Sequence, residues 1–73
     1  MTYRKAAQTA YNYRDSTNRE AYARRAIRKH GQKFWTLAMS LLAKIEEVET
    51  EQPDACRAAI EAEAVRRLEG ALP

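Results

Sequence analysis

The chain has very little of the chemistry from which most active sites are built. Its 73 residues include one cysteine, Cys56, and one histidine, His30, so it has no internal disulfide and no pair of such ligands at zinc-binding spacing. Glycine and proline occur only twice each, and no glycine-rich phosphate loop and no Ser, His and Asp set is present. We therefore expect a protein that is not an enzyme and that holds no metal and no cofactor.

Long apolar runs are also missing. The longest, LAMSLLA at residues 37–43, is far shorter than the roughly 20 residues that a membrane-spanning helix requires. The start, MTYRKAAQTAYNYR, has basic residues but no apolar segment behind them, which excludes a secretory signal. We therefore expect a cytoplasmic protein. It forms one small domain, since a chain of this length buries only about 60% of the surface that it exposes when unfolded.

Charge is unevenly distributed along the chain. Residues 1–33 carry nine Lys or Arg and two acids, a net charge of +7, whereas residues 34–73 carry four basic and eight acidic residues, a net charge of −4. All four tyrosines lie in the basic half. This asymmetry predicts a basic interaction segment attached to an acidic helical body.

Three helices are indicated, at residues 17–30, 32–51 and 54–69. Thr17 and Glu20 stand at capping-box spacing, and Gly31 is a suitable C-terminal cap because it adopts positive φ without strain. Apolar residues recur at helical spacing most strongly in residues 32–51. Pro53 suits the first turn of the last helix, which Gly70 ends. The sequence thus predicts an all-α fold, a small three-helix bundle over residues 17–70.

Residues 1–16 contain no clear cap and end in the polar, turn-prone stretch NYRDSTN. We expect them to form a flexible or weakly helical basic and aromatic arm that becomes ordered on a partner. In the helical body, we expect Trp35 to be partly exposed beside the first interhelical turn, and Cys56 to be a small buried residue of the last helix.

If the three helices are antiparallel, their charges separate into two poles. The end of the first helix, the start of the second and the end of the third then form a basic pole with Arg28, Lys29, His30, Lys33, Arg66 and Arg67. The turn between the last two helices forms an acidic pole with Glu46, Glu47, Glu49, Glu51 and Asp54. Helix length places the poles some 25 Å apart. Salt screens the interaction between charges beyond roughly 10 Å, so the two poles do not neutralise each other.

The candidate partner-binding residues lie on the first helix and in the arm. On the helix, residues spaced four apart are neighbours, so its basic positions form one broad face. This face suits phosphates or an acidic protein surface, whereas the simpler interpretation is a solvated face that complements the helix dipole. Tyrosine and arginine are enriched at binding hot spots. The candidates are Tyr3, Arg4, Tyr11, Tyr13, Arg14, Arg24, Arg25, Arg28 and Lys29.

A helix-turn-helix that binds DNA is an alternative, because two helices flank Gly31. Its second helix would have to present polar side chains to base edges. After Gln32, Lys33, Thr36 and Ser40, however, the helix at 32–51 becomes apolar and then acidic. Sequence-specific DNA binding is therefore disfavoured, while weak electrostatic contact with RNA or DNA stays open.

In length, in its Tyr- and Arg-rich start TYRKAAQTAYNYR and in its Ala- and Arg-rich helical body, the chain resembles small phage-encoded regulators that bind bacterial RNA polymerase. The resemblance contains no diagnostic motif and transfers no individual binding residue. It implies docking on the polymerase β′ N-terminal region and β flap near the RNA exit channel, in the bacterial host cytoplasm. It further implies inhibition of initiation by σ displacement, and antitermination.

The residues alone indicate a module that acts by stoichiometric binding, for which we favour a monomer. Two other classes stay open: a small basic nucleic-acid-binding protein, and a phage-type inhibitor or adaptor of another host protein that acts as a homodimer. The Ala-rich face expected for the last helix leaves apolar area that a second copy would cover.

Overall fold

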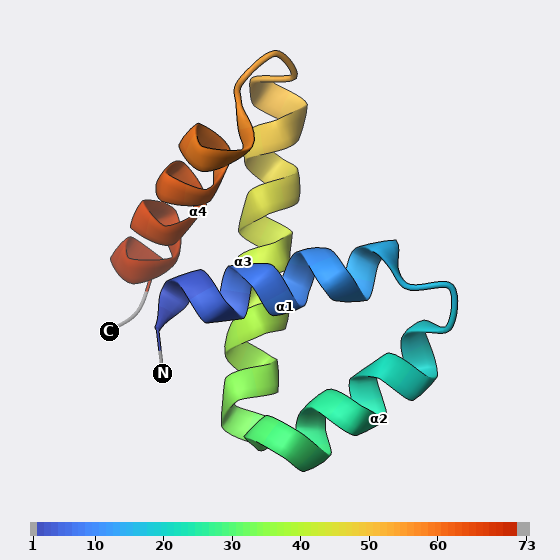
Figure 1. Ribbon diagram of the computed structural model, residues 1–73. Coiled ribbons are helices and arrows are strands. Elements are labelled where there is room, and N and C mark those ends of the chain that lie inside the picture. Colours follow the sequence, from blue (N-terminus) through green and yellow to red (C-terminus); the bar gives the residue numbers. More distant parts are fainter. Residues whose placement is uncertain (1, 72–73) are drawn as a thin grey trace.

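In the computed structural model, which describes residues 2–71, the chain forms four helices and these residues include no strand (Figure 1). The helices are α1 (Tyr3–Asp15), α2 (Arg19–His30), α3 (Gln32–Glu51) and α4 (Arg57–Ala71). The predicted all-α class is confirmed. The predicted three-helix bundle with a flexible arm is wrong, because most of that arm is α1.

Helix α1 forms because it is capped and because its small side chains fit closely against α3. The hydroxyl of Thr2 accepts a hydrogen bond from the Lys5 backbone N–H at 3.3 Å. Ala6, Ala7 and Ala10 are fully buried, and alanine lets two helix backbones approach closely. The segment is thus one side of the hydrophobic core.

Helix α2 begins at a different cap from the predicted one. The Asn18 side chain, and not that of Thr17, accepts a hydrogen bond from the Ala21 N–H at 3.1 Å, so the helix starts at Arg19. It ends at Gly31, whose φ of 94° and ψ of 161° are accessible almost only to glycine. The role predicted for Gly31 is confirmed, and α3 starts directly after it.

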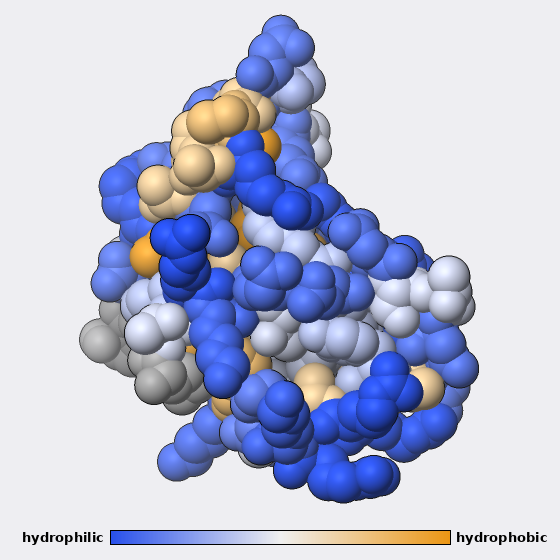
Figure 2. Space-filling view, in the orientation of Figure 1, coloured by the Kyte–Doolittle hydropathy of each residue, from blue (hydrophilic) through white to orange (hydrophobic). Residues whose placement is uncertain are grey.

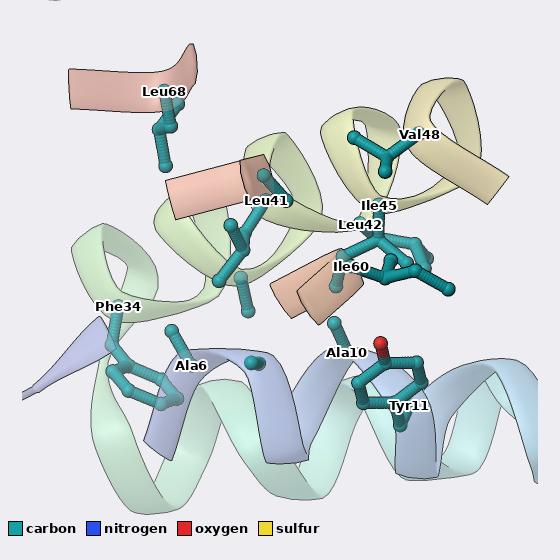
Figure 3. Close-up of a cluster of buried hydrophobic side chains, with 13 residues drawn as sticks. Ala6, Ala10, Tyr11, Phe34, Leu41, Leu42, Ile45, Val48, Ile60 and Leu68 are labelled. Carbon is teal, nitrogen blue, oxygen red and sulfur yellow. The ribbon is translucent and has the colours of Figure 1, made fainter. Parts of the chain in front are cut away.

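Helix α3 has the bounds that its periodicity predicted, and it contacts each of the other three helices. Its buried residues are Phe34, Ala38, Leu41, Leu42, Ile45 and Val48. They form one cluster with Ala6, Ala10 and Tyr11 of α1 and Ile60 and Leu68 of α4. Figure 3 shows the larger side chains of this cluster. The core is therefore organised around one long helix.

Helix α4 starts and ends later than predicted. Its entry is a turn in which the Ala55 N–H donates to the Gln52 carbonyl at 3.1 Å, so the helix begins at Arg57 and not near Asp54. Gly70 lies inside the helix, which continues to Ala71. Cys56 is exposed, which corrects the expectation that it is a core residue.

The molecule is thin. Its dimensions are 32 × 31 × 15 Å, and packed helix axes lie roughly 8–10 Å apart, so the shortest dimension holds about two layers of helix. Figure 1 shows α1 crossing in front of α3, with α2 and α4 on either side. Because so little is enclosed, most charged side chains lie on the surface.

Candidate functional site

Helix α2 contributes least to the core and presents most of its basic residues to solvent. Ala26 is its one buried residue, whereas α1 buries five and α3 six. Arg24, Arg25, Arg28 and Lys29 are all exposed, as predicted for a partner-binding face. The outer face of this helix is therefore not used in the core.

Only one of these four cations has an acidic partner. The Arg24 guanidinium lies 2.6 Å from the Glu20 carboxylate one turn earlier, and both side chains are largely exposed. Among the described residues, Arg25, Arg28 and Lys29 form no ion pair. Their charges are therefore available to an external anion or an acidic surface.

The starts of α1 and α3 add further cations to this region. Burial, and then the positive charges of Lys5 of α1 and Lys29 of α2, lower the pKa of His30 below its ordinary value of 6.5. Lys33 follows in the first turn of α3 and is exposed. We call the group of Lys5, Arg25, Arg28, Lys29 and Lys33 the basic end.

The surface of the basic end is hollowed. A hollow of about 310 Å³ is lined by Tyr22, Arg25, Ala26, Lys29 and His30. Figure 2 shows strongly hydrophilic side chains along the lower rim of the molecule, where α2 lies in Figure 1. Tyr22 supplies an aromatic wall among the cations, a combination that suits macromolecular contacts.

The aromatic residues predicted to act from a flexible arm are instead part of the folded body. Tyr11 is 3% exposed, and Tyr3 and Tyr13 are half-buried against the core. The Tyr13 ring packs edge-on against Trp35 at 5.2 Å, which accounts for the partial exposure correctly predicted for Trp35. Tyr11 is thus a core residue, and Tyr3 and Tyr13 pack against the core with part of each side chain exposed.

The two arginines predicted from the same segment differ from each other. Arg14 forms an ion pair with Glu49 of α3 at 2.7 Å, so its charge is used within the fold. Arg4 is exposed and has no acidic partner among the described residues. Arg4 is therefore the candidate of this segment that is exposed, and it lies on α1 one position before Lys5 of the basic end.

The charges of the two predicted poles are not separated as expected. Arg67 bonds to Glu51 at 2.6 Å and Glu63 at 2.8 Å, and it approaches Glu47 at 3.6 Å, so it belongs to the acidic end of α3 and not to the basic end. At the same end, Lys44 pairs with Glu47 and Arg14 pairs with Glu49. The acidic end is largely neutralised within the molecule, whereas the basic end is not.

His30, which the sequence assigned to the basic pole, packs against an aromatic residue of α3. The His30 ring packs on Phe34, with ring centres 4.9 Å apart, beside the turn at Gly31. No group of His, Cys, Asp and Glu side chains in residues 2–71 is arranged to hold a metal ion.

Sequence reasoning did not include Lys5 in the candidate surface. The signal was present in Thr2, a capping residue, followed by alanines at helical spacing, which together predict a packed helix and hence a fixed position for Lys5. Lys33 was assigned to the basic pole but was not named as a binding residue, although it lies just beyond Gly31.

Each of the described helices is too short or too polar to cross a membrane. The chain matches no protein-family model, no curated protein and no solved structure.

Proposed function

We propose that this protein is a stoichiometric regulator that docks its basic end on an acidic surface of bacterial RNA polymerase. The observation that carries the proposal is the contrast between the two ends of the molecule: Arg25, Arg28 and Lys29 have no internal partner, while the acidic end is paired internally. The choice of polymerase rests on the resemblance in length and character to phage regulators of that enzyme.

In this proposal the partner surface is the β′ N-terminal region and β flap near the RNA exit channel. Docking there displaces σ and inhibits initiation, and it promotes antitermination during elongation. Complementary charge speeds encounter and fixes the orientation of the complex. The protein acts by occupying this surface and catalyses no reaction itself.

The size of the molecule is adequate for such a role. Its accessible surface is 4948 Å², and a standard protein interface uses about 800 Å² per partner, roughly a sixth of that surface. In this proposal the interface is formed by the exposed face of α2 together with exposed residues at the starts of α1 and α3. A thin molecule suits insertion beside a larger partner.

The helix-turn-helix alternative loses support from the position of α3. A recognition helix has to enter the major groove with its side chains free. Here α3 is the central helix, and Phe34, Ala38 and Leu41 are buried near its start. Binding of nucleic acid through the cations of α2 alone would be electrostatic and without sequence preference.

The deciding experiment combines transcription and binding with purified polymerase from the appropriate bacterium. Added protein is expected to form a complex at micromolar concentration, to lower promoter-dependent initiation and to raise read-through at an intrinsic terminator. Absence of all three effects overturns the proposal. Sedimentation of the free protein at several concentrations tests the homodimer alternative, for which the exposed Ala58, Ala59 and Ala62 of α4 are the available apolar area.

A matched pair of double variants locates the surface. Arg28→Glu with Lys29→Glu is expected to weaken polymerase binding at least tenfold without loss of helicity, because both residues are exposed. Arg57→Glu with Arg66→Glu changes net charge equally on α4 and is expected to bind within about threefold of the unmodified protein. Equal losses in both variants contradict docking through α2, and tight binding of RNA or DNA in place of polymerase favours the nucleic-acid alternative.

A further inference from the structure

A second hollow lies between α1 and α4. Its volume is about 340 Å³, at the lower end of the range for small-molecule sites. Arg4, Gln8 and Tyr11 line it from one face of α1, since their spacing is four and three residues. Arg57, Ala58 and Glu61 line it from the first turns of α4.

The guanidinium of Arg57 packs against the ring of Tyr11. Its central carbon lies 3.7 Å from the centre of the Tyr11 ring, a close cation–π contact. A guanidinium in contact with an aromatic ring keeps the N–H groups that point away from the ring available for a planar or tetrahedral oxyanion. The Tyr11 ring is itself fixed, because the residue is 3% exposed.

Neither arginine of the hollow has an acidic partner. Within residues 2–71, Arg4 and Arg57 form no ion pair, although Glu61 lies in the same lining one turn after Arg57. Arg14 provides a contrast, since it also approaches the Tyr11 ring, at 5.2 Å, but is already bonded to Glu49. The lining of the hollow therefore carries two guanidinium groups without an ion-pair partner and one carboxylate, so positive charge is in excess.

The backbone at this place favours the same kind of ligand. Helix α4 begins at Arg57, and the Cys56 carbonyl accepts the first bond of the helix from the Ile60 N–H at 3.0 Å. The first N–H groups of a helix have no carbonyl of their own helix to bind, and they carry partial positive charge. Ala58, in this first turn, lines the hollow and has no side chain large enough to block it.

We propose that the hollow between α1 and α4 is a binding site for a phosphate-sized oxyanion, held by the guanidinium groups of Arg57 and Arg4. The oxyanion is either free phosphate or the terminal phosphoryl group of a small molecule. Glu61 accepts a hydrogen bond from a protonated oxygen of the ligand, a bond that phosphate forms near neutral pH and that sulfate lacks. This site does not depend on docking through α2.

The test follows backbone amide shifts by NMR while inorganic phosphate is added at constant ionic strength, with chloride as the balancing anion. Saturable shifts at Ala58 and Tyr11 are expected, with a Kd in the millimolar range, the strength of about 4 kcal/mol. Adenosine monophosphate in a parallel titration distinguishes a site for free phosphate from one that also admits a phosphoryl group on a larger molecule. Shifts that grow linearly with either ligand, or that appear only around Arg28, overturn the proposal.

Variants make the assignment specific. Arg57→Gln and, independently, Arg4→Gln are each expected to raise the phosphate Kd at least fivefold, and both positions are exposed, so the fold is retained. Arg66→Gln removes an exposed arginine on the same helix outside the hollow and is expected to leave the Kd within twofold. Glu61→Gln is expected to reduce the preference for phosphate over sulfate. Unchanged affinity in both Arg57→Gln and Arg4→Gln shows that the hollow is not the site.

Discussion

Arg14 on α1 forms a two-bonded ion pair with Glu49 near the end of α3, its Nη1 and Nη2 atoms lying 2.7 Å and 3.3 Å from the two carboxylate oxygens. The pair joins residues 35 positions apart in the sequence. It fixes the end of α1, the helix that stands where a flexible segment was expected, against the long central helix.

The contribution of this pair is measurable by a double-mutant cycle with Arg14→Gln and Glu49→Gln. Their side chains are 28% and 33% exposed, so solvent screens part of the attraction. Two-bonded geometry places the coupling free energy at about 0.5–1 kcal/mol, the upper part of the range for surface pairs. Urea unfolding of the four proteins gives the value. The more exposed Arg24–Glu20 pair is the control, with a coupling of at most about 0.5 kcal/mol. A coupling near zero for Arg14 and Glu49 contradicts a structural role for the contact.

Prediction from the sequence was most accurate for α3, whose own residues carry a clear helical pattern. The apolar stripe of α3 is long and regular, and both of its ends were correctly predicted. Helix α1 was missed because Ala6, Ala7 and Ala10 carry little hydrophobic area, so their pattern is weak until α3 is present to bury them. The start of α4 was predicted too early, because Pro53 marks the turn and not the first turn of the helix.

The residues of the candidate surface also differ in whether their own helix determines their position. The exposure of Arg24, Arg25, Arg28 and Lys29 follows from the pattern of α2 itself and was predicted. The burial of Tyr11 and the pairing of Arg14 depend on α3 and α4, and Arg67 meets Glu51 only because of the direction in which α4 packs. No spacing rule within the sequence encodes such angles, so the sequence did not show that Tyr11 is a core residue or that Tyr3 and Tyr13 pack against the core.

Because α1 is a core element, a charge on its inner face is expected to unfold the protein. Ala10 is fully buried, so Ala10→Glu places an unpaired carboxylate in the core at a cost of several kcal/mol, comparable to the whole stability of so small a domain. Circular dichroism is expected to show lost helicity and no cooperative thermal transition. Asn12→Glu, an exposed position on the same helix, is the control and changes stability by at most about 0.5 kcal/mol. Normal folding of Ala10→Glu contradicts the packed position of α1.

The hydroxyl of Tyr11 is enclosed and makes no hydrogen bond, although Arg57 lies over its ring. Burial raises the pKa of this phenol, against the opposing effect of the Arg57 charge. An enclosed hydroxyl without a partner is destabilising, so Tyr11→Phe is expected to raise the free energy of unfolding by about 0–2 kcal/mol. Tyr22→Phe, at a partly exposed ring, is the control and is expected to have little effect. A loss of more than about 0.5 kcal/mol in Tyr11→Phe shows that the hydroxyl has a partner in solution.

Glu63 is the carboxylate whose ionisation the fold favours most clearly. Hydrogen bonds from Arg66, and then from Arg67, lower its pKa from an ordinary value of 4.5 to about 2. The donors are the Arg66 Nε and Nη2 atoms at 2.9 Å and 2.6 Å and the Arg67 Nε atom at 2.8 Å. A lowered pKa means that the folded protein favours the charged form. The resulting stabilisation is therefore fully present above pH 4.5 and is lost as the pH falls from 4.5 through about 2.

An NMR titration of the Glu63 side-chain carboxyl carbon checks this prediction. In the folded protein the midpoint is expected near pH 2, and in urea it is expected to return to about 4.5. Arg66→Gln with Arg67→Gln removes the three donors and is expected to raise the midpoint of the folded protein towards 4.5, because the neutral amides supply no positive charge. The same midpoint in the variant and the unmodified protein would show that the two arginines do not hold this carboxylate in solution.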